Sequence, residues 1–238
     1  MASAGVVIEQ EQREPGNPTP LRRTTFYLDA GRLRIESKSA EGEDTVTIFD
    51  EAKQVVWVVD RAAGTYTELT AAKVREMQQR MEEARKQMDA QLAQMPPERR
   101  RMIEEMMKLQ MGSGAATTVR EVGREEKVGP YTCIRYEQIS QGQRVGEFWA
   151  APLDQLQLGE PEYKTFQTLT RFLEPLGGAG ARLVSGGREI QGFPVRSLTY
   201  EGQQVVAEET VAKAERRRLD AGLFQLPPGL TKSEFELE

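Results

Sequence analysis

A stretch with the chemistry of a helix, residues 70–112, separates two blocks in which apolar and polar residues alternate. In these blocks, residues 5–69 and 117–216, apolar residues recur at every second position, which is typical of strands buried on one face. The pattern predicts a single domain over residues 1–238 with an α+β fold. We expect a curved antiparallel β-sheet, a half-open barrel, with the helical insert and a second helix packed on its concave face.

The insert is rich in methionine. Its apolar residues recur three and four positions apart, which places them on one stripe of a helix. Thr70 is a candidate N-cap, proline at 96 and 97 ends this helix, and a second helical segment is expected from Pro97 to Gly112. The stripe predicts a face that packs on the sheet, or alternatively a surface that adapts to a lipid or a partner, because methionine repacks around irregular guests. The stripe consists of Val74, Met77, Met81, Ala84, Met88, Leu92 and Met95.

Two further segments predict how the sheet is covered. Residues 160–176 have helical spacing, with aromatic and leucine side chains on one face, and give the second helix. Residues 55–59 are apolar on both faces, which indicates a strand covered on both sides.

Composition excludes several kinds of chemistry. The chain contains no histidine and one cysteine, Cys133, so imidazole-based catalysis, imidazole metal sites and an intramolecular disulfide are excluded. The methionines are spread over many turns, which disfavours a copper site. The net charge of −5 disfavours a nucleic-acid partner. We therefore predict a protein that is not an enzyme, with no catalytic residue, no metal and no cofactor.

The N-terminus indicates export. Met1 is followed by Ala2-Ser3-Ala4, and Ala-x-Ala is the small-residue pattern of a signal-peptidase site. We interpret it as the stub of a removed signal peptide, which predicts a periplasmic or extracytoplasmic location; an ordinary small-residue N-terminus is the alternative. No apolar run approaches the roughly 20 residues of a membrane span, so we expect no transmembrane segment in this chain.

Short motifs occur along most of the chain, at residues 32–35, 49–50, 55–59, 65–68, 97–111, 129–136, 147–149 and 223–229. They resemble the LolA/LolB/LppX-like periplasmic lipoprotein-carrier superfamily, and in particular a bacterial branch with a Met-rich helical insert. The resemblance implies an antiparallel sheet curled into a half-open barrel, with helices on the concave face and a lipid or an acylated lipoprotein as cargo. The long charged insert departs from the pattern of the superfamily.

Two functions follow as hypotheses. The first is an exported, non-catalytic envelope protein that binds a lipid, a lipoprotein acyl chain or another apolar ligand on the concave face. The second is a structural or protein-interaction module of the envelope whose concavity is filled by its own helices. The candidate lining residues, chosen by alternation, are Phe26, Ile35, Phe49, Trp57, Met81, Met88, Tyr136, Trp149 and Phe193.

Overall fold

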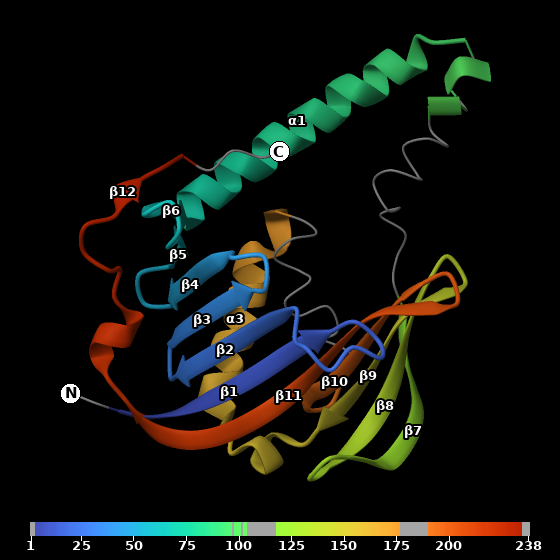
Figure 1. The fold of residues 1–238 in the computed structure, drawn as a ribbon. Coiled ribbons are helices and arrows are strands. Elements are labelled where there is room, and N and C mark those ends of the chain that lie inside the picture. The colour runs from blue at the N-terminus through green and yellow to red at the C-terminus, as the bar shows by residue number, and fades with distance from the viewer. Residues whose placement is uncertain (1–2, 97, 101, 104–117, 177–189, 235–238) are drawn as a thin grey trace.

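The structure, a computed structural model, describes residues 3–96, 98–100, 102–103, 118–176 and 190–234 (Figure 1). The first block forms six strands. They are β1 (Ser3–Arg13), β2 (Arg22–Asp29), β3 (Arg32–Ser39), β4 (Asp44–Asp50), β5 (Val55–Asp60) and β6 (Thr65–Thr70).

The helices and the later strands follow in chain order. They are α1 (Ala71–Ala93), β7 (Thr118–Val128), β8 (Tyr131–Ser140), β9 (Gln143–Ala151), η1 (Leu153–Leu156), α3 (Glu160–Leu173), η2 (Glu174–Leu176), β10 (Phe193–Glu201), β11 (Gln204–Leu219), η3 (Ala221–Phe224) and β12 (Thr231–Lys232). The helical segment expected from Pro97 to Gly112 lies largely outside the described residues. Its described part, residues 98–100 and 102–103, is helical.

All twelve strands of the described residues belong to one sheet. Its order is β12-β6-β5-β4-β3-β2-β1-β11-β10-β9-β8-β7. Strands that follow one another in the sequence pair antiparallel from β1 to β6 and from β7 to β11, and β1 pairs with β11 in a ladder that runs from Ser3–Leu219 to Arg13–Glu208. This ladder joins the two blocks into one surface. Only β12, which pairs with β6, is parallel to its neighbour.

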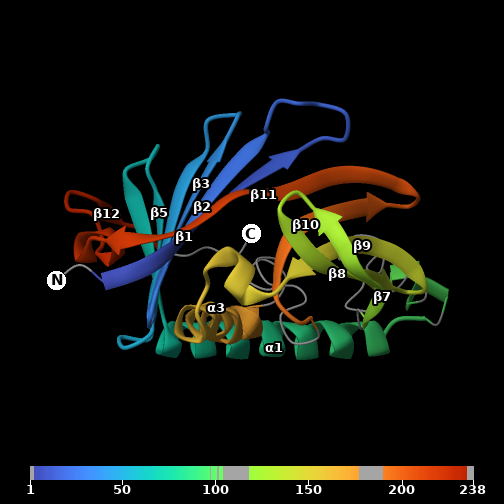
Figure 2. The same cartoon turned by 90° about the horizontal axis from the view of Figure 1, so that it is seen from below.

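The two longer helices lie on the same side of the sheet. Figure 2 shows α3 between the curved sheet and α1, which runs across the open side of the curve. The sheet is therefore open, curved and almost wholly antiparallel, with helices on its concave face. The predicted α+β fold class is confirmed.

The core follows from this layering. The main hydrophobic cluster joins the concave side of the sheet to α3 and to the first turns of α1. A smaller cluster on the convex side packs Val46, Ile48 and Val59 under Leu226 and Leu230 of the C-terminal segment. Within β5, Val56 belongs to the first cluster and Trp57 to the second, which confirms the two-sided cover predicted for residues 55–59.

Candidate functional site: the concave face of the sheet

The helix α3 forms because its apolar residues recur on one face and its N-terminus suits a helix. Gly159 is the N-cap, Pro161 lies in the first turn, and Glu160 and Glu162 place negative charge at the positive end of the helix dipole. The buried residues of α3 include Tyr163, Phe166, Leu169 and Leu173. This face is directed at the sheet.

Aromatic side chains fill the space between α3 and the sheet. The ring of Phe166 lies 6.0 Å from Phe26 of β2 in an edge-on arrangement and 5.7 Å from Phe193 of β10. Phe172 lies 5.8 Å from Phe49 of β4. These separations are those of aromatic pairs in direct contact. The helix thus spans the concave face from β4 to β10.

A buried threonine fixes α3 to the β2–β3 turn. The hydroxyl of Thr165, which is 1% exposed, accepts a hydrogen bond of 2.8 Å from the backbone N–H of Gly31. The same hydroxyl lies 3.0 Å from the carbonyl of Pro161 and 3.3 Å from the carbonyl of Asp29, to which it can donate. Gly31 has a φ of 78°, so the turn that presents this N–H favours glycine. The position of α3 is therefore set by directional hydrogen bonds as well as by apolar contact.

The first turn of α3 has a second polar attachment. Glu162, which is almost fully buried, pairs with Arg216 of β11 at 2.9 Å. Arg216 also donates to the carbonyl of Gln157, at 3.0 Å. Beside them, the hydroxyl of Tyr163 donates to the carbonyl of Gly192, at 3.3 Å, and burial raises the pKa of this tyrosine above its ordinary value. Polar bonds to β11 and to the start of β10 thus hold one end of α3.

Beyond α3, strands β7 to β10 contribute polar and aromatic side chains. The indole N–H of Trp149 donates to Glu126 at 2.7 Å, and the guanidinium of Arg196 lies 4.8 Å from the centre of the indole ring. The neighbouring Glu147 accepts a short hydrogen bond from the hydroxyl of Tyr200. Burial raises the pKa of Tyr200, and the bond to Glu147 raises it further. These groups bind one another, which is the usual state of a structural polar network.

Glu147 also has an ionic partner. Arg144 approaches it at 3.2 Å and stacks 4.2 Å from the ring centre of Tyr200. Arg196 pairs in the same way with Glu208 at 2.7 Å. Each of these two carboxylates therefore has a cation or a hydroxyl beside it, so the arrangement provides charge complementarity within the sheet.

Two surface depressions of the described residues lie away from α3. One, of about 440 Å³, is bordered by Arg34 and by residues 220–228 of the C-terminal segment. Arg34 is buried there, donates to the carbonyl of Leu223 at 2.9 Å and pairs with Glu36 at 2.6 Å. The other, also about 440 Å³, is bordered by residues 19–25 and 36–44 together with Arg61. Neither is bordered by a residue of the α3 face.

The structure brings together five of the nine predicted lining residues. They belong to the main cluster that α3 covers, and they are Phe26, Ile35, Phe49, Trp149 and Phe193. All five are buried. Whether any of them contacts a ligand stays a prediction.

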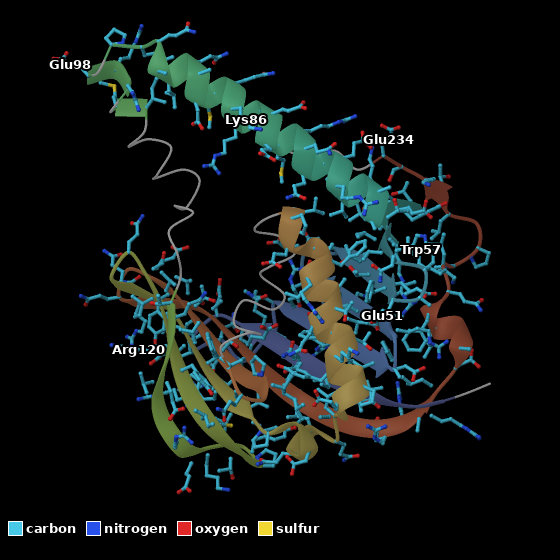
Figure 3. All side chains as sticks on the ribbon, turned by 180° about the vertical axis from the view of Figure 1, so that it is seen from behind. Glu51, Trp57, Lys86, Glu98, Arg120 and Glu234 are labelled. Carbon is cyan, nitrogen blue, oxygen red and sulfur yellow. The ribbon has the colours of Figure 1, made fainter. Side chains whose placement is uncertain are left out.

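The other four lie apart. Trp57 faces the C-terminal segment, where its indole donates to Glu68 at 3.0 Å (Figure 3 shows its place on the sheet). Tyr136 stacks on Phe148 and accepts a hydrogen bond from the N–H of Gln191, on the face opposite to Trp149 because successive strand residues alternate. Met81 and Met88 are half-buried on α1 and belong to none of the clusters that the described residues form.

Sequence reasoning missed the residues that fix α3. No sequence pattern singled out Thr165, Glu162 or the partner Arg216. One signal was present. A threonine or a glutamate within the apolar stripe of a helix needs a bonding partner when it is buried. The partner itself is set by the fold.

Two properties of the described residues bear on the chemistry of the site. No group of three histidine, cysteine, aspartate or glutamate side chains there is placed to hold a metal ion. No helix among these residues is long and apolar enough to cross a membrane.

The fold and the site define a class of protein: an α+β chain with an open, curved, mainly antiparallel sheet whose concave side is occupied by its own helix. Residues 100–230, more than half of the chain, match the family described as Domain of unknown function (DUF4412). The chain belongs to this family. No curated protein matches the sequence.

Three solved structures are similar to this chain over most of its length. The crystal structure of MucB in complex with MucA(peri) is similar with a TM-score of 0.39 and 9% identity, over 96% of this chain and 56% of that one. The MucA/MucB complex of Pseudomonas aeruginosa gives 0.40 and 10%, over 94% and 56%. MucB alone gives 0.38 and 10%, over 96% and 59%. The chain therefore spans less than two thirds of each, and its function has to be inferred from its own structure.

Proposed function

We propose that the protein is an exported, non-catalytic module of the bacterial cell envelope that acts by binding another protein, with its concave face closed by its own helix. The observation that carries this proposal is the aromatic contact of α3 with the sheet, in which Phe166 meets Phe26 and Phe193. A lipid carrier needs that space for its cargo. Here the chain itself fills it.

Estimated free energies of burial favour the arrangement in which α3 stays on the concave face. An acyl chain gains about 0.8 kcal/mol for each buried methylene, or on the order of 10 kcal/mol before the costs of ordering it. Displacing α3 exposes Tyr163, Phe166, Leu169 and Leu173, each worth about 1.5–3 kcal/mol, so about 6–12 kcal/mol in all. It also breaks the bonds of Thr165 to the β2–β3 turn. The gain from a lipid is therefore offset by the loss of the helix.

The proposed location is extracytoplasmic. It is supported by the resemblance of the motifs of this chain to those of periplasmic carrier domains. Binding of a lipid or an acylated protein on the concave face is the competing function, and the same experiment decides between the two.

The test is native mass spectrometry, with lipid extraction, of the protein purified from a bacterial periplasm. We expect the mass of the polypeptide alone. A lipid that co-purifies in stoichiometric amount would overturn the proposal and support the carrier function.

A matched variant makes a negative result informative. Phe166→Ala removes the ring between Phe26 and Phe193 and leaves a cavity lined by apolar groups. We expect this variant, and not the wild-type protein, to take up a small apolar probe such as benzene. Equal uptake by both proteins would show that the concave face is already open.

A further inference from the structure

The helix α1 has an apolar stripe that the sheet uses only in part. The helix is 23 residues long, and two of its side chains, Val74 and Met77 in the first two turns, join the main core. Its later turns continue past the end of α3, and Glu98 lies beyond its far end (Figures 2 and 3). Along those turns Met81 and Met88 are half-buried and Leu92 is buried; Met95, also half-buried, lies two residues past the end of the helix.

The spacing of the stripe is that of a coiled-coil seam. Val74, Met81, Met88 and Met95 are seven residues apart, at the positions conventionally called a. Met77 and Ala84 lie three residues after the first two of them, at position d. We call residues 74, 77, 81, 84, 88 and 95 the α1 seam. A seam with this repeat fits a second helix, and methionine allows it to adapt to the partner's side chains.

The flanks of the α1 seam are basic. Arg80 and Arg85, at the neighbouring positions g and e, have side chains 69% and 79% exposed, and each has an acidic neighbour on α1 itself: Glu76 lies 2.6 Å from Arg80, and Asp89 lies 3.9 Å from Arg85. No acidic residue occupies an e or g position between residues 73 and 94 of the sequence. Two copies of α1 in parallel would place Arg80 opposite Arg85 of the other copy, and like charges across a seam disfavour that pairing. Acidic residues on a different helix would complement both.

We propose that the α1 seam docks an amphipathic helix of a partner protein that carries glutamate or aspartate beside its apolar stripe. The inference rests on the proposed function as an interaction module and assigns the surface and the kind of partner. The arginines fix the register and select the charge, and the methionines supply the apolar contact.

The experiment uses two synthetic peptides of about three heptads, with leucine at a and d. One carries glutamate at e and g, and the other carries lysine there. Binding of each labelled peptide to the full chain is measured by fluorescence anisotropy. We expect the glutamate peptide to bind at least about tenfold more tightly than the lysine peptide.

Charge reversal provides the matched controls. The double variant Arg80→Glu/Arg85→Glu reverses the flanks and should reverse the preference between the peptides. The double variant Arg75→Glu/Lys86→Glu changes the same charge on the outer side of α1, where Figure 3 labels Lys86, and should keep the preference of the wild type. Met88→Asp should abolish binding of both peptides. Circular dichroism checks that each variant retains the helix content of the wild type.

Several results would overturn the inference. They are binding of neither peptide, equal binding of both, or an equal response to the two double variants. A dimer that Met88→Asp dissolves would assign the α1 seam to a second copy instead. Lipid that co-purifies while the peptide preference persists would overturn the proposed function and leave the docking surface in place, so the two failures are distinguishable.

Discussion

The helices α1 and α3 lie on the same side of the sheet, yet they are used differently. The shorter α3 buries six of its 14 residues and is bonded to a turn and to β11. The longer α1 buries three of 23. Both are amphipathic in sequence. The difference shows that an apolar stripe predicts a contact face, whereas the path of the helix over the sheet decides how much of that face is covered.

The difference also separates stability from recognition. A helix whose stripe is fully covered contributes to the core, and changes in it act on the whole domain. A helix whose stripe continues past its cover contributes less to the core, and we propose that the remaining stripe of α1 binds a partner. The following experiments compare the two helices on this basis.

The largest difference in the free energy of unfolding is expected between two variants that each shorten an apolar side chain, one on each helix. Phe166→Ala should lower the free energy of unfolding by about 3–5 kcal/mol, because it empties a site between two other rings. Met88→Ala, on the half-buried part of α1, should change it by less than about 0.5 kcal/mol. Urea unfolding followed by circular dichroism measures both. Equal losses would contradict the division between the helices.

The polar attachment of α3 is tested by Thr165→Val. The change keeps the shape and leaves the N–H of Gly31 without its acceptor, so we expect a loss of about 1–3 kcal/mol in the free energy of unfolding. Thr168→Val is the matched control, since this exposed threonine of the same helix bonds only to the carbonyl of Lys164 and to Arg171. If the control costs as much as the buried variant, the attachment does not position the helix.

The N-cap of α1 should act locally. The Thr70 hydroxyl accepts a hydrogen bond from the N–H of Lys73 at 3.2 Å, and Thr70→Ala should weaken the helix by about 1 kcal/mol. Hydrogen exchange should become faster in the first turns of α1 and stay unchanged in α3. A uniform increase over both helices would mean that α1 is part of the same cooperative core.

The smallest effect at neutral pH, and the one with a pH signature, is expected from Tyr163→Phe. Burial raises the pKa of Tyr163, while a hydrogen bond with Gln167 lowers it in part. The folded state disfavours the charged form of Tyr163. The contribution of this group to the free energy of unfolding is therefore fully present below its pKa in the unfolded chain, about 10, and is lost as the pH rises above that value. Tyr163→Phe should cost about 1 kcal/mol at neutral pH. It should also reduce the alkaline loss, as measured by urea midpoints between about pH 9 and pH 11. An unchanged alkaline slope would argue against a buried hydroxyl.

The sequence allowed the fold class to be predicted, but only part of the site. Alternation located strands such as β3 and β4, and the spacing at residues 160–176 located α3 with its buried face. Alternation states which neighbours share a face and leaves open which face lies under a helix. Trp57 and Tyr136 were therefore grouped with Phe26, although each packs on the other side of the sheet.

Local periodicity and composition are properties of the sequence itself, so the two strand blocks, the helical stripes and the absence of imidazole chemistry were determined there. Tertiary structure decided the ladder between β1 and β11, which joins residues about 200 positions apart, and the choice of α3 as the helix that fills the concavity. Contacts across such separations depend on register, twist and bulges along the whole sheet. No local pattern encodes them, and they determine which apolar stripe is buried and which stays available.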